Sequence, residues 1–180
     1  MTDDLGAAQL IEDTRSRILP LSVIARGSAL TRQADLTKPP GSLGRLEELS
    51  VAIAAMTDTE RPRLTERLVV VAAGDHGVTK RGVSAYPAEV TGQMVGNFLS
   101  GGAAINVLAR HADARVRVVD AGVASPTADV PELLKLQLGS GTADITEGPA
   151  MSRETAERAV AAGIRLFEEE LTSPGVDIVA

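Results

Sequence analysis

The sequence predicts an α/β fold built around a parallel sheet, and two observations carry this prediction. Two short segments, the continuously apolar Leu68–Ala73 and the segment Val116–Val119, have the length and β-branched content of strands buried on both faces of a sheet. Around them, apolar residues recur at intervals of three or four positions, as on one face of a helix. Strands that alternate with helices in this way are typical of βαβ crossovers, which produce parallel sheets.

The N-terminal third is predicted to be helical. Thr2 can cap a first helix that runs to about Ile18, and a second helix follows to about Gln33. The segment Lys38–Ser42 then interrupts, because its two prolines cannot continue a helix. A third helix follows, with a predicted apolar face formed by Leu46, Leu49, Ile53 and Met56.

The central region is predicted to contain the strands and the loop between them. A glycine-rich loop joins the strand Leu68–Ala73 to a helix beginning near Pro87, whose predicted inner face is Val90, Met94 and Phe98. Another helix runs from about Ala103 to His111 and leads into the strand Val116–Val119. The alternation of Leu134, Leu136 and Leu138 favours a short, half-exposed strand.

The C-terminal region is predicted to form a long helix and the start of a further strand. Ser152 can cap the helix. Val176–Ala180 has the apolar character of another strand. The chain stops within this strand, whereas a ligand site in such a sheet is expected to use the loop that follows the strand. We therefore expect the chain to be the N-terminal portion of a longer protein. The predicted inner face of the helix is Ala156, Val160, Ile164, Phe167 and Leu171.

Composition excludes several classes of protein. The net charge of -6 and an aromatic content of 2% argue against a nucleic-acid partner. The chain has no cysteine and two histidines, so neither a disulfide framework nor a metal site built from several His or Cys ligands is expected. No basic signal segment or membrane-spanning run is seen. We therefore expect a cytoplasmic protein with no membrane partner.

The loop that follows the first predicted strand is a candidate ligand site. In parallel sheets, ligands bind beyond the carboxyl ends of the strands, and Gly74, Asp75, His76 and Gly77 stand at such an end. The same residues are equally compatible with a tight turn in which the polar side chains satisfy each other. The segment Gly77–Ser84 is not a phosphate loop, because Val83 occupies the place of the required lysine.

The entrance of the following helix is a second candidate. Tyr86 is the single tyrosine, and its flat ring could line a pocket there or cover the helix end as a core residue. Met94 lies two turns further along and could fill core space equally well.

Seven short blocks of the sequence resemble those of one enzyme family, the nicotinate-nucleotide:dimethylbenzimidazole phosphoribosyltransferases. Their order and specificity make this signal far stronger than any lone glycine motif. The resemblance extends over essentially the whole chain, which reaches about half of the family's usual length. The blocks are Leu36–Glu47, Ala73–Val78, Gly82–Ser84, Glu89–Thr91, Gly101–Asn106, Val119–Val123 and Pro149–Arg153.

The resemblance implies a fold and an activity. The fold is a Rossmann-like parallel sheet with helices on both faces, together with a small helical domain built from both chain termini. Residues 1–60 would contribute to the small domain, and residues 61–180 would form an incomplete Rossmann-like domain. The activity is transfer of phosphoribose from nicotinate mononucleotide to 5,6-dimethylbenzimidazole, which gives α-ribazole 5′-phosphate and nicotinate for cobalamin assembly. The family is homodimeric, and its reaction needs no cofactor or metal.

The resemblance also implies the base-binding side of a site. Tyr86 and Met94 are expected to contact the base, with Ser84 and Gln93 nearby. Asp75, His76 and Gly77 are expected to shape the floor. The general base of the family is a glutamate that would lie beyond Ala180, so no catalytic residue is assigned and the chain alone is expected to be inactive. An alternative is a non-catalytic half-domain that binds a benzimidazole or a nucleotide.

Overall fold

The computed structural model describes residues 6–172 and 175–180. The described residues divide into two compact units. The first unit joins the N-terminal segment up to Ser16 to Thr65–Ala180, and the second is Arg17–Leu64. No helix within the described ranges is long and apolar enough to cross a membrane.

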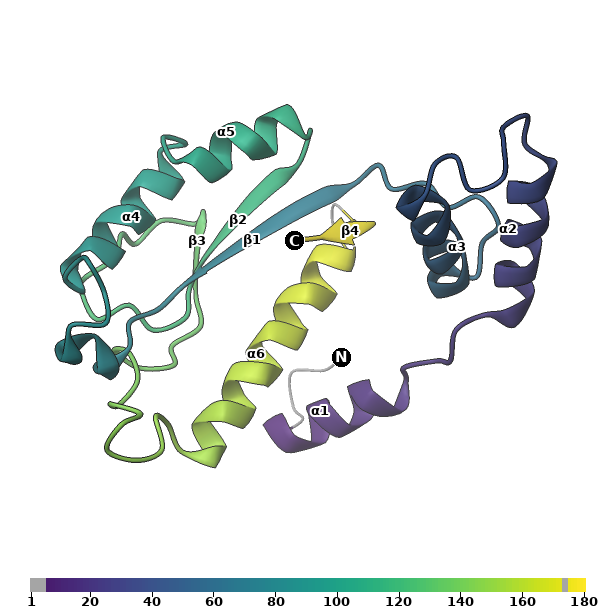
Figure 1. The fold of residues 1–180 in the computed structure, drawn as a ribbon. Coiled ribbons are helices and arrows are strands. Elements are labelled where there is room, and N and C mark those ends of the chain that lie inside the picture. The colour runs from purple at the N-terminus through teal and green to yellow at the C-terminus, as the bar shows by residue number, and fades with distance from the viewer. Residues whose placement is uncertain (1–5, 173–174) are drawn as a thin grey trace. The chain divides into compact units, whose positions relative to one another are not determined.

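The first unit is built on a parallel sheet, as predicted (Figure 1). The described part of the chain places its strands in the order β3-β2-β1-β4, and each neighbouring pair is parallel. Val69 of β1 lies opposite Val116 of β2, and Val71 lies opposite Val118. The strands are β1 (Arg67–Ala73), β2 (Arg115–Asp120), β3 (Leu133–Lys135) and β4 (Ile178–Val179).

Burial of β1 on both faces is realised only in part. Leu68 is buried, whereas Ala72 is exposed and the other residues of the strand are partly exposed. β4 pairs only with Arg67 and Leu68 at the beginning of β1. The later residues of β1 therefore lie at an edge that no described strand covers, which explains their exposure.

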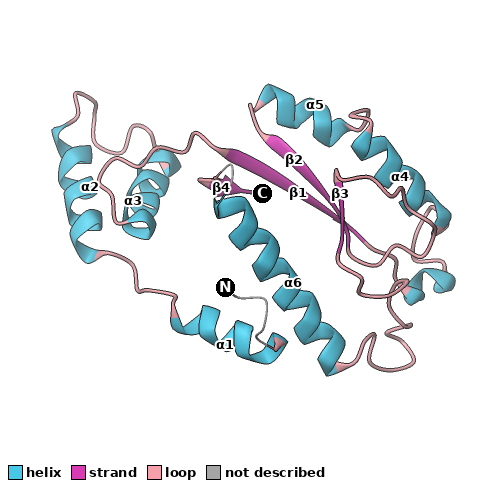
Figure 2. Ribbon diagram, turned by 180° about the vertical axis from the view of Figure 1, so that it is seen from behind, coloured by secondary structure: helices cyan, strands magenta, loops and turns pink. Residues whose placement is uncertain are grey.

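Helices cover both faces of the sheet (Figures 1 and 2). α4 (Glu89–Leu99) and α5 (Ala104–His111) lie over one face. There, Val95 of α4 packs in a cluster with Val118 and Leu133 of the strands. α6 (Arg153–Thr172) lies over the other face. The predicted α/β architecture with a Rossmann-like sheet is thus confirmed.

The predicted inner face of α6 is wrong. Ser152 does cap the helix, because its Oγ accepts the N–H of Thr155 at 3.1 Å. The buried residues, however, are Ala161, Leu166 and Glu170. Members of the predicted face remain about half exposed: Val160 at 53%, Phe167 at 45% and Leu171 at 48%.

Charge explains this orientation of α6. The carboxylate of Glu170 accepts a hydrogen bond from Arg115 at 2.8 Å and lies 3.6 Å from Arg117. Both arginines project from the same face of β2, because side chains alternate along a strand. The ion pairs therefore turn Glu170, rather than Phe167 or Leu171, toward the sheet.

The first helix, α1 (Ala7–Ser16), packs against α6. Its residues therefore group with the sheet, whereas the sequence placed them with the other N-terminal helices in a segment of residues 1–60. Leu10 of α1 is buried and can pack in this way only because α6, far along the chain, supplies a surface. The predicted cap Thr2 lies outside the described residues.

The second unit is a pair of helices, α2 (Val23–Asp35) and α3 (Arg45–Thr57). Ser22 caps α2 by accepting the N–H of Ala25 at 3.1 Å. The core between the helices consists of Ala29, Val51 and Ala54.

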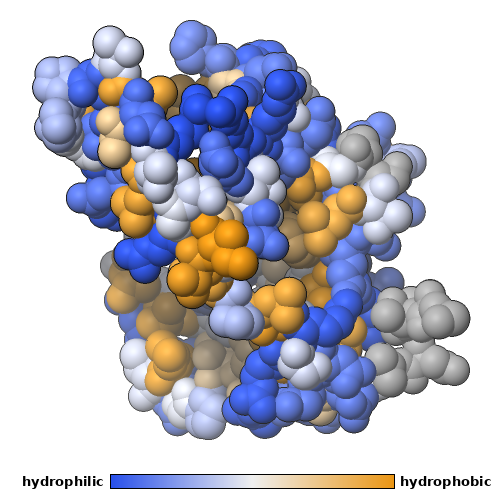
Figure 3. Space-filling model, turned by 90° about the vertical axis from the view of Figure 1, so that its right-hand side faces the viewer, coloured by the Kyte–Doolittle hydropathy of each residue, from blue (hydrophilic) through white to orange (hydrophobic). Residues whose placement is uncertain are grey.

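The predicted apolar face of α3 is largely exposed. Leu46 and Met56 are 65% and 67% exposed, and Leu49 is exposed as well. Small residues of α3 are buried instead, since they allow α2 to approach closely. Figure 3 shows apolar patches that remain at the surface on the side of the molecule in view.

Candidate functional site

The turn after β1 is held by the carboxylate of Asp75. Its Oδ1 accepts a hydrogen bond from Thr91 Oγ1 at 2.6 Å, and its Oδ2 accepts the N–H of Ala124 at 2.7 Å. The side chain is buried, with Asp75 8% exposed. The backbone N–H of Asp75 donates to the carbonyl of Gly122 at 3.0 Å. Asp75 thus ties the end of β1 to α4 and to the loop that follows β2.

A distant segment closes on the same turn. The N–H of Thr142 donates to the carbonyl of Asp75, and the N–H of Gly77 donates to the carbonyl of Thr142, both at 3.0 Å. A Cβ atom at Gly77 would lie 2.6 Å from the backbone carbon of Ala143. Glycine is therefore required at position 77, because backbone occupies the space of a side chain.

An ion pair reinforces this closure. Arg81, at the end of the 3-10 helix η1 (Gly77–Arg81), donates to Asp144 at 2.7 Å and also pairs with Glu147. The hydrogen bond from Arg81, followed by those from Thr146, lowers the pKa of Asp144 below its ordinary value. The ion pairs of Arg81 with Asp144 and Glu147 are therefore explained as contacts that join two loops of the fold.

The turn after β2 is built in a similar way. Asp120 accepts the N–H groups of Gly122 at 3.0 Å and Val123 at 2.8 Å, and the hydroxyl of Thr127 at 2.8 Å. Burial raises the pKa of Asp120, but these hydrogen bonds outweigh it and hold the pKa below its ordinary value. The block Val119–Val123 therefore has a structural role, because it shapes the loop to which Asp75 is hydrogen-bonded.

A pocket of about 270 Å³ opens at the carboxyl end of β1, and we call it the β1 pocket. Its position is the one where parallel sheets bind ligands. It is small among ligand pockets, which suits one compact heterocycle. Its lining consists of Gly74, Asp75, His76, Thr79, Ser84, Tyr86, Pro87, Ala88, Val90, Thr91 and Met94.

Most of the residues singled out from the sequence meet in the β1 pocket. Asp75, His76, Ser84, Tyr86 and Met94 all line it. Tyr86 is 71% exposed and Met94 36% exposed, so both have surface available to a ligand.

Two residues singled out from the sequence do not line the β1 pocket. Gly77 lies against the Ala143 backbone instead, and Gln93 is an exposed residue of α4. The predicted inner face of α4 also shifts: Val95 is the buried residue of the helix, while Met94 lies toward the pocket.

Sequence reasoning missed Thr79 and Thr91 as pocket residues. Thr91 is within the block Glu89–Thr91 that carries the family resemblance, one turn before Met94 on the same helix. That spacing was a signal that could have found it, because residues three apart share a helix face. Thr79 had no comparable signal.

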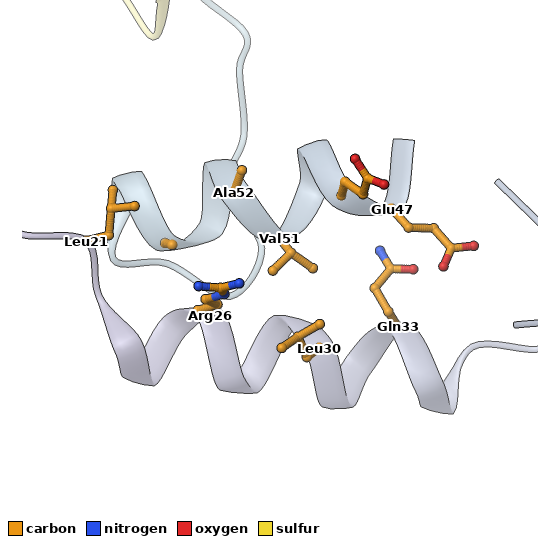
Figure 4. Close-up of a pocket in the computed structure, with 9 residues that line it drawn as sticks. Leu21, Arg26, Leu30, Gln33, Glu47, Val51 and Ala52 are labelled. Atoms are coloured by element: carbon orange, nitrogen blue, oxygen red, sulfur yellow. The ribbon is translucent and has the colours of Figure 1, made fainter. Parts of the chain in front are cut away.

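A larger cavity lies in the second unit, between α2 and α3, with a volume of about 480 Å³ (Figure 4). Leu30 and Val51 point toward one another across it. Its lining combines apolar side chains with Arg26, Gln33, Glu47 and Glu48, and the described part of this unit contributes no strand end to it. We therefore place the candidate site in the β1 pocket despite its smaller volume.

Comparison with known proteins decides the family. A family model described as phosphoribosyltransferase matches residues 18–180. The chain belongs to this phosphoribosyltransferase family. A relative from Roseiflexus sp. (strain RS-1), named nicotinate-nucleotide–dimethylbenzimidazole phosphoribosyltransferase, is 57% identical over 171 residues, which are 95% of this chain and 48% of the relative. A relative of the same name from Geobacter sulfurreducens is 48% identical over 160 residues, 89% of this chain and 46% of the relative.

Solved structures agree with the family assignment. The crystal structure of the enzyme of that name from Thermus thermophilus aligns with a TM-score of 0.82 at 47% identity, over 86% of this chain and 47% of that chain. The resemblance read from the seven sequence blocks is thereby confirmed. This phosphoribosyltransferase chain spans about half the length of the relatives that it matches.

Proposed function

We propose that this phosphoribosyltransferase chain serves the transfer of phosphoribose from nicotinate mononucleotide to 5,6-dimethylbenzimidazole, with release of nicotinate. The observation that carries the proposal is the 57% identity over 95% of the chain to a relative named for this reaction. The alternative of a non-catalytic binding module is not favoured, because the relatives reported above are all named as the transferase.

The chemistry of the transfer needs acidic surroundings rather than a metal. Nicotinate departs from a pyridinium, so its ring nitrogen needs no acid to protonate it. Positive charge develops on the ribose in the transition state, where carboxylates stabilise it. A carboxylate must also accept the N–H proton of the benzimidazole as the other ring nitrogen attacks the anomeric carbon. We assign this base to the glutamate that the family resemblance predicts beyond Ala180.

The β1 pocket is proposed to hold the benzimidazole. Tyr86 and Met94 offer flat and polarisable surfaces to an aromatic ring. His76 lies at the pocket wall, and Asp75 shapes it from behind. Ser84 lines the pocket beside Tyr86, whereas Gln93 can take part only if its exposed side chain turns toward the ring.

Titration calorimetry with 5,6-dimethylbenzimidazole tests this assignment. Met94→Lys places a charge in the pocket, so the affinity of this variant for 5,6-dimethylbenzimidazole is expected to fall at least about tenfold. Met151→Lys is the matched control, because Met151 is similarly exposed, at 42%, and lies outside the pocket lining. Equal affinity of both variants and the unmodified chain would contradict base binding in the β1 pocket.

An assay of nicotinate release tests the catalytic part. The 180-residue chain is expected to give no turnover with nicotinate mononucleotide and 5,6-dimethylbenzimidazole, since the proposed base lies elsewhere. Robust turnover would contradict that placement of the base.

Location and assembly belong to the same proposal. The protein is proposed to work in the cytoplasm as a homodimer, with α2 and α3 contributing to a small helical domain. Sedimentation equilibrium checks the assembly. A particle of twice the 18.7 kDa mass of one chain is expected, and a monomer at all concentrations would contradict the homodimer.

A further inference from the structure

Hydroxyl groups that line the β1 pocket offer acceptors rather than donors. Among the described lining residues, these hydroxyls belong to Thr79, Ser84 and Thr91, apart from the phenol of Tyr86. Thr79 Oγ1 donates to the carbonyl of His76 at 2.8 Å, and Ser84 Oγ donates to the carbonyl of Tyr86 at 2.9 Å. A hydroxyl carries one proton and two lone pairs, so each oxygen has spent its proton within the protein.

Thr91 is the most strongly fixed of these hydroxyls. Its Oγ1 donates to Asp75 Oδ1 at 2.6 Å, and a carboxylate oxygen of this kind accepts without donating. The other carboxylate oxygen of Asp75 accepts the N–H of Ala124 at 2.7 Å, so the carboxylate cannot turn away. Burial of Asp75 strengthens both bonds. The lone pairs of Thr91 Oγ1 are therefore the part of the hydroxyl that remains for a ligand.

We propose that the β1 pocket selects a heteroaromatic base through an N–H group, with Thr91 Oγ1 as the acceptor and Asp75 as the positioning residue that directs the Thr91 hydroxyl. The inference rests on the proposed function, in which the base is a benzimidazole with one N–H and one unprotonated ring nitrogen. Holding the N–H at Thr91 fixes the orientation of the ring and leaves the other nitrogen free to attack. The contact orients the base before the reaction and gives way to the carboxylate that removes the proton.

A pair of ligands of nearly equal shape tests the acceptor. The dissociation constants of the 180-residue chain are measured for 5,6-dimethylbenzimidazole and for 5,6-dimethylbenzoxazole, in which a ring oxygen replaces the N–H. The unmodified chain is expected to bind the benzimidazole about tenfold more tightly than the benzoxazole. The benzimidazole makes one good hydrogen bond to Thr91, whereas the ring oxygen of the benzoxazole places two acceptors opposite each other. Thr91→Val is expected to bring the ratio to about one, and Thr91→Ser to restore it.

Asp75→Asn tests the positioning role. An asparagine whose oxygen keeps the Ala124 N–H must donate its amide N–H to Thr91, which turns the hydroxyl proton toward the pocket. Either ligand can then present an unprotonated ring nitrogen to this proton, so the ratio is expected to fall to about one. A merely structural Asp75 would weaken both ligands equally and leave the ratio unchanged, which would overturn its role.

Each remaining outcome is also decisive. A ratio near one in the unmodified chain, or a ratio that survives Thr91→Val, overturns the inference while base binding stands. Failure of both ligands to bind overturns the proposed base-binding function and the inference with it. If Asp75→Asn does not fold, the unmodified chain is examined by proton NMR. A slowly exchanging, downfield hydroxyl proton of Thr91 is expected there, and its absence overturns the role of Asp75.

Discussion

At the scale of single residues, Gly77 shows how a turn depends on the absence of a side chain. A Cβ atom at Gly77 would lie 2.6 Å from the Ala143 backbone, which the hydrogen bonds of Thr142 hold against the end of β1. Gly77→Ala is therefore expected to lower the free energy of unfolding by about 1–3 kcal/mol, measured by urea denaturation.

A matched glycine serves as control for this prediction. Gly96 lies inside α4 with open space where its Cβ would be. Gly96→Ala is expected to raise the free energy of unfolding by about 0.5–1 kcal/mol, because alanine favours the helix. A loss of stability in both variants would show that the Gly77 contact is not the cause.

Asp120 is a single residue that is expected to make the stability of the fold depend on pH. Its lowered pKa means that folding stabilises the ionised form. This contribution is fully present above the ordinary carboxyl pKa of 3.8 and is lost as the pH falls through the lower pKa of the folded state. Asp120→Asn is expected to cost about 1 kcal/mol at pH 7 and to flatten the fall in stability below pH 3.8.

Urea denaturation at a series of pH values measures both effects of Asp120→Asn. Asp129→Asn removes a nearby carboxylate that is fully exposed. It is expected to leave the pH profile of stability unchanged. Identical profiles for Asp120→Asn and the unmodified chain would contradict the role of the hydrogen bonds around Asp120.

At the scale of elements, α6 shows where periodicity reaches its limit. The apolar residues at helical spacing predict a buried face that includes Val160, whereas the structure buries Leu166 and Glu170. Periodicity reports that a helix has an apolar stripe, but α6 carries more than one. The choice between them depends on Arg115 and Arg117 of β2, which no local pattern reveals.

Truncation of two side chains of α6 measures this choice. Leu166→Ala is expected to lower the free energy of unfolding by about 2–4 kcal/mol, because Leu166 is 8% exposed. Val160→Ala is expected to cost less than about 1 kcal/mol, because Val160 is 53% exposed. The reverse order of the two costs would restore the face that periodicity predicts.

At the scale of the whole molecule, the β1 pocket is a property of one unit. All of its lining residues lie between Gly74 and Met94, within the unit that contains the sheet. Val51 belongs to the core of the other unit and is 8% exposed. Val51→Ala is therefore expected to lower the free energy of unfolding by about 1–2 kcal/mol and to leave the affinity for 5,6-dimethylbenzimidazole unchanged.

Calorimetry and urea denaturation on the same variants check this separation. Thr91→Val is the counterpart, since it is expected to change the choice of ligand, whereas Val51→Ala is not. A parallel loss of stability and affinity in Val51→Ala would show that the pocket depends on the second unit.

Local chemistry along the chain was enough to predict the helices and strands, the ligand loop at the end of β1 and the family. Apolar runs, proline breaks and short ordered motifs are properties of neighbouring residues, so they can be read without coordinates. Three features needed the tertiary structure: the pairing of α1 with α6, the buried faces of α3 and α6, and the bond between Asp75 and Thr91. Each depends on contacts between residues far apart in the sequence, where burial and charge pairing outweigh local pattern.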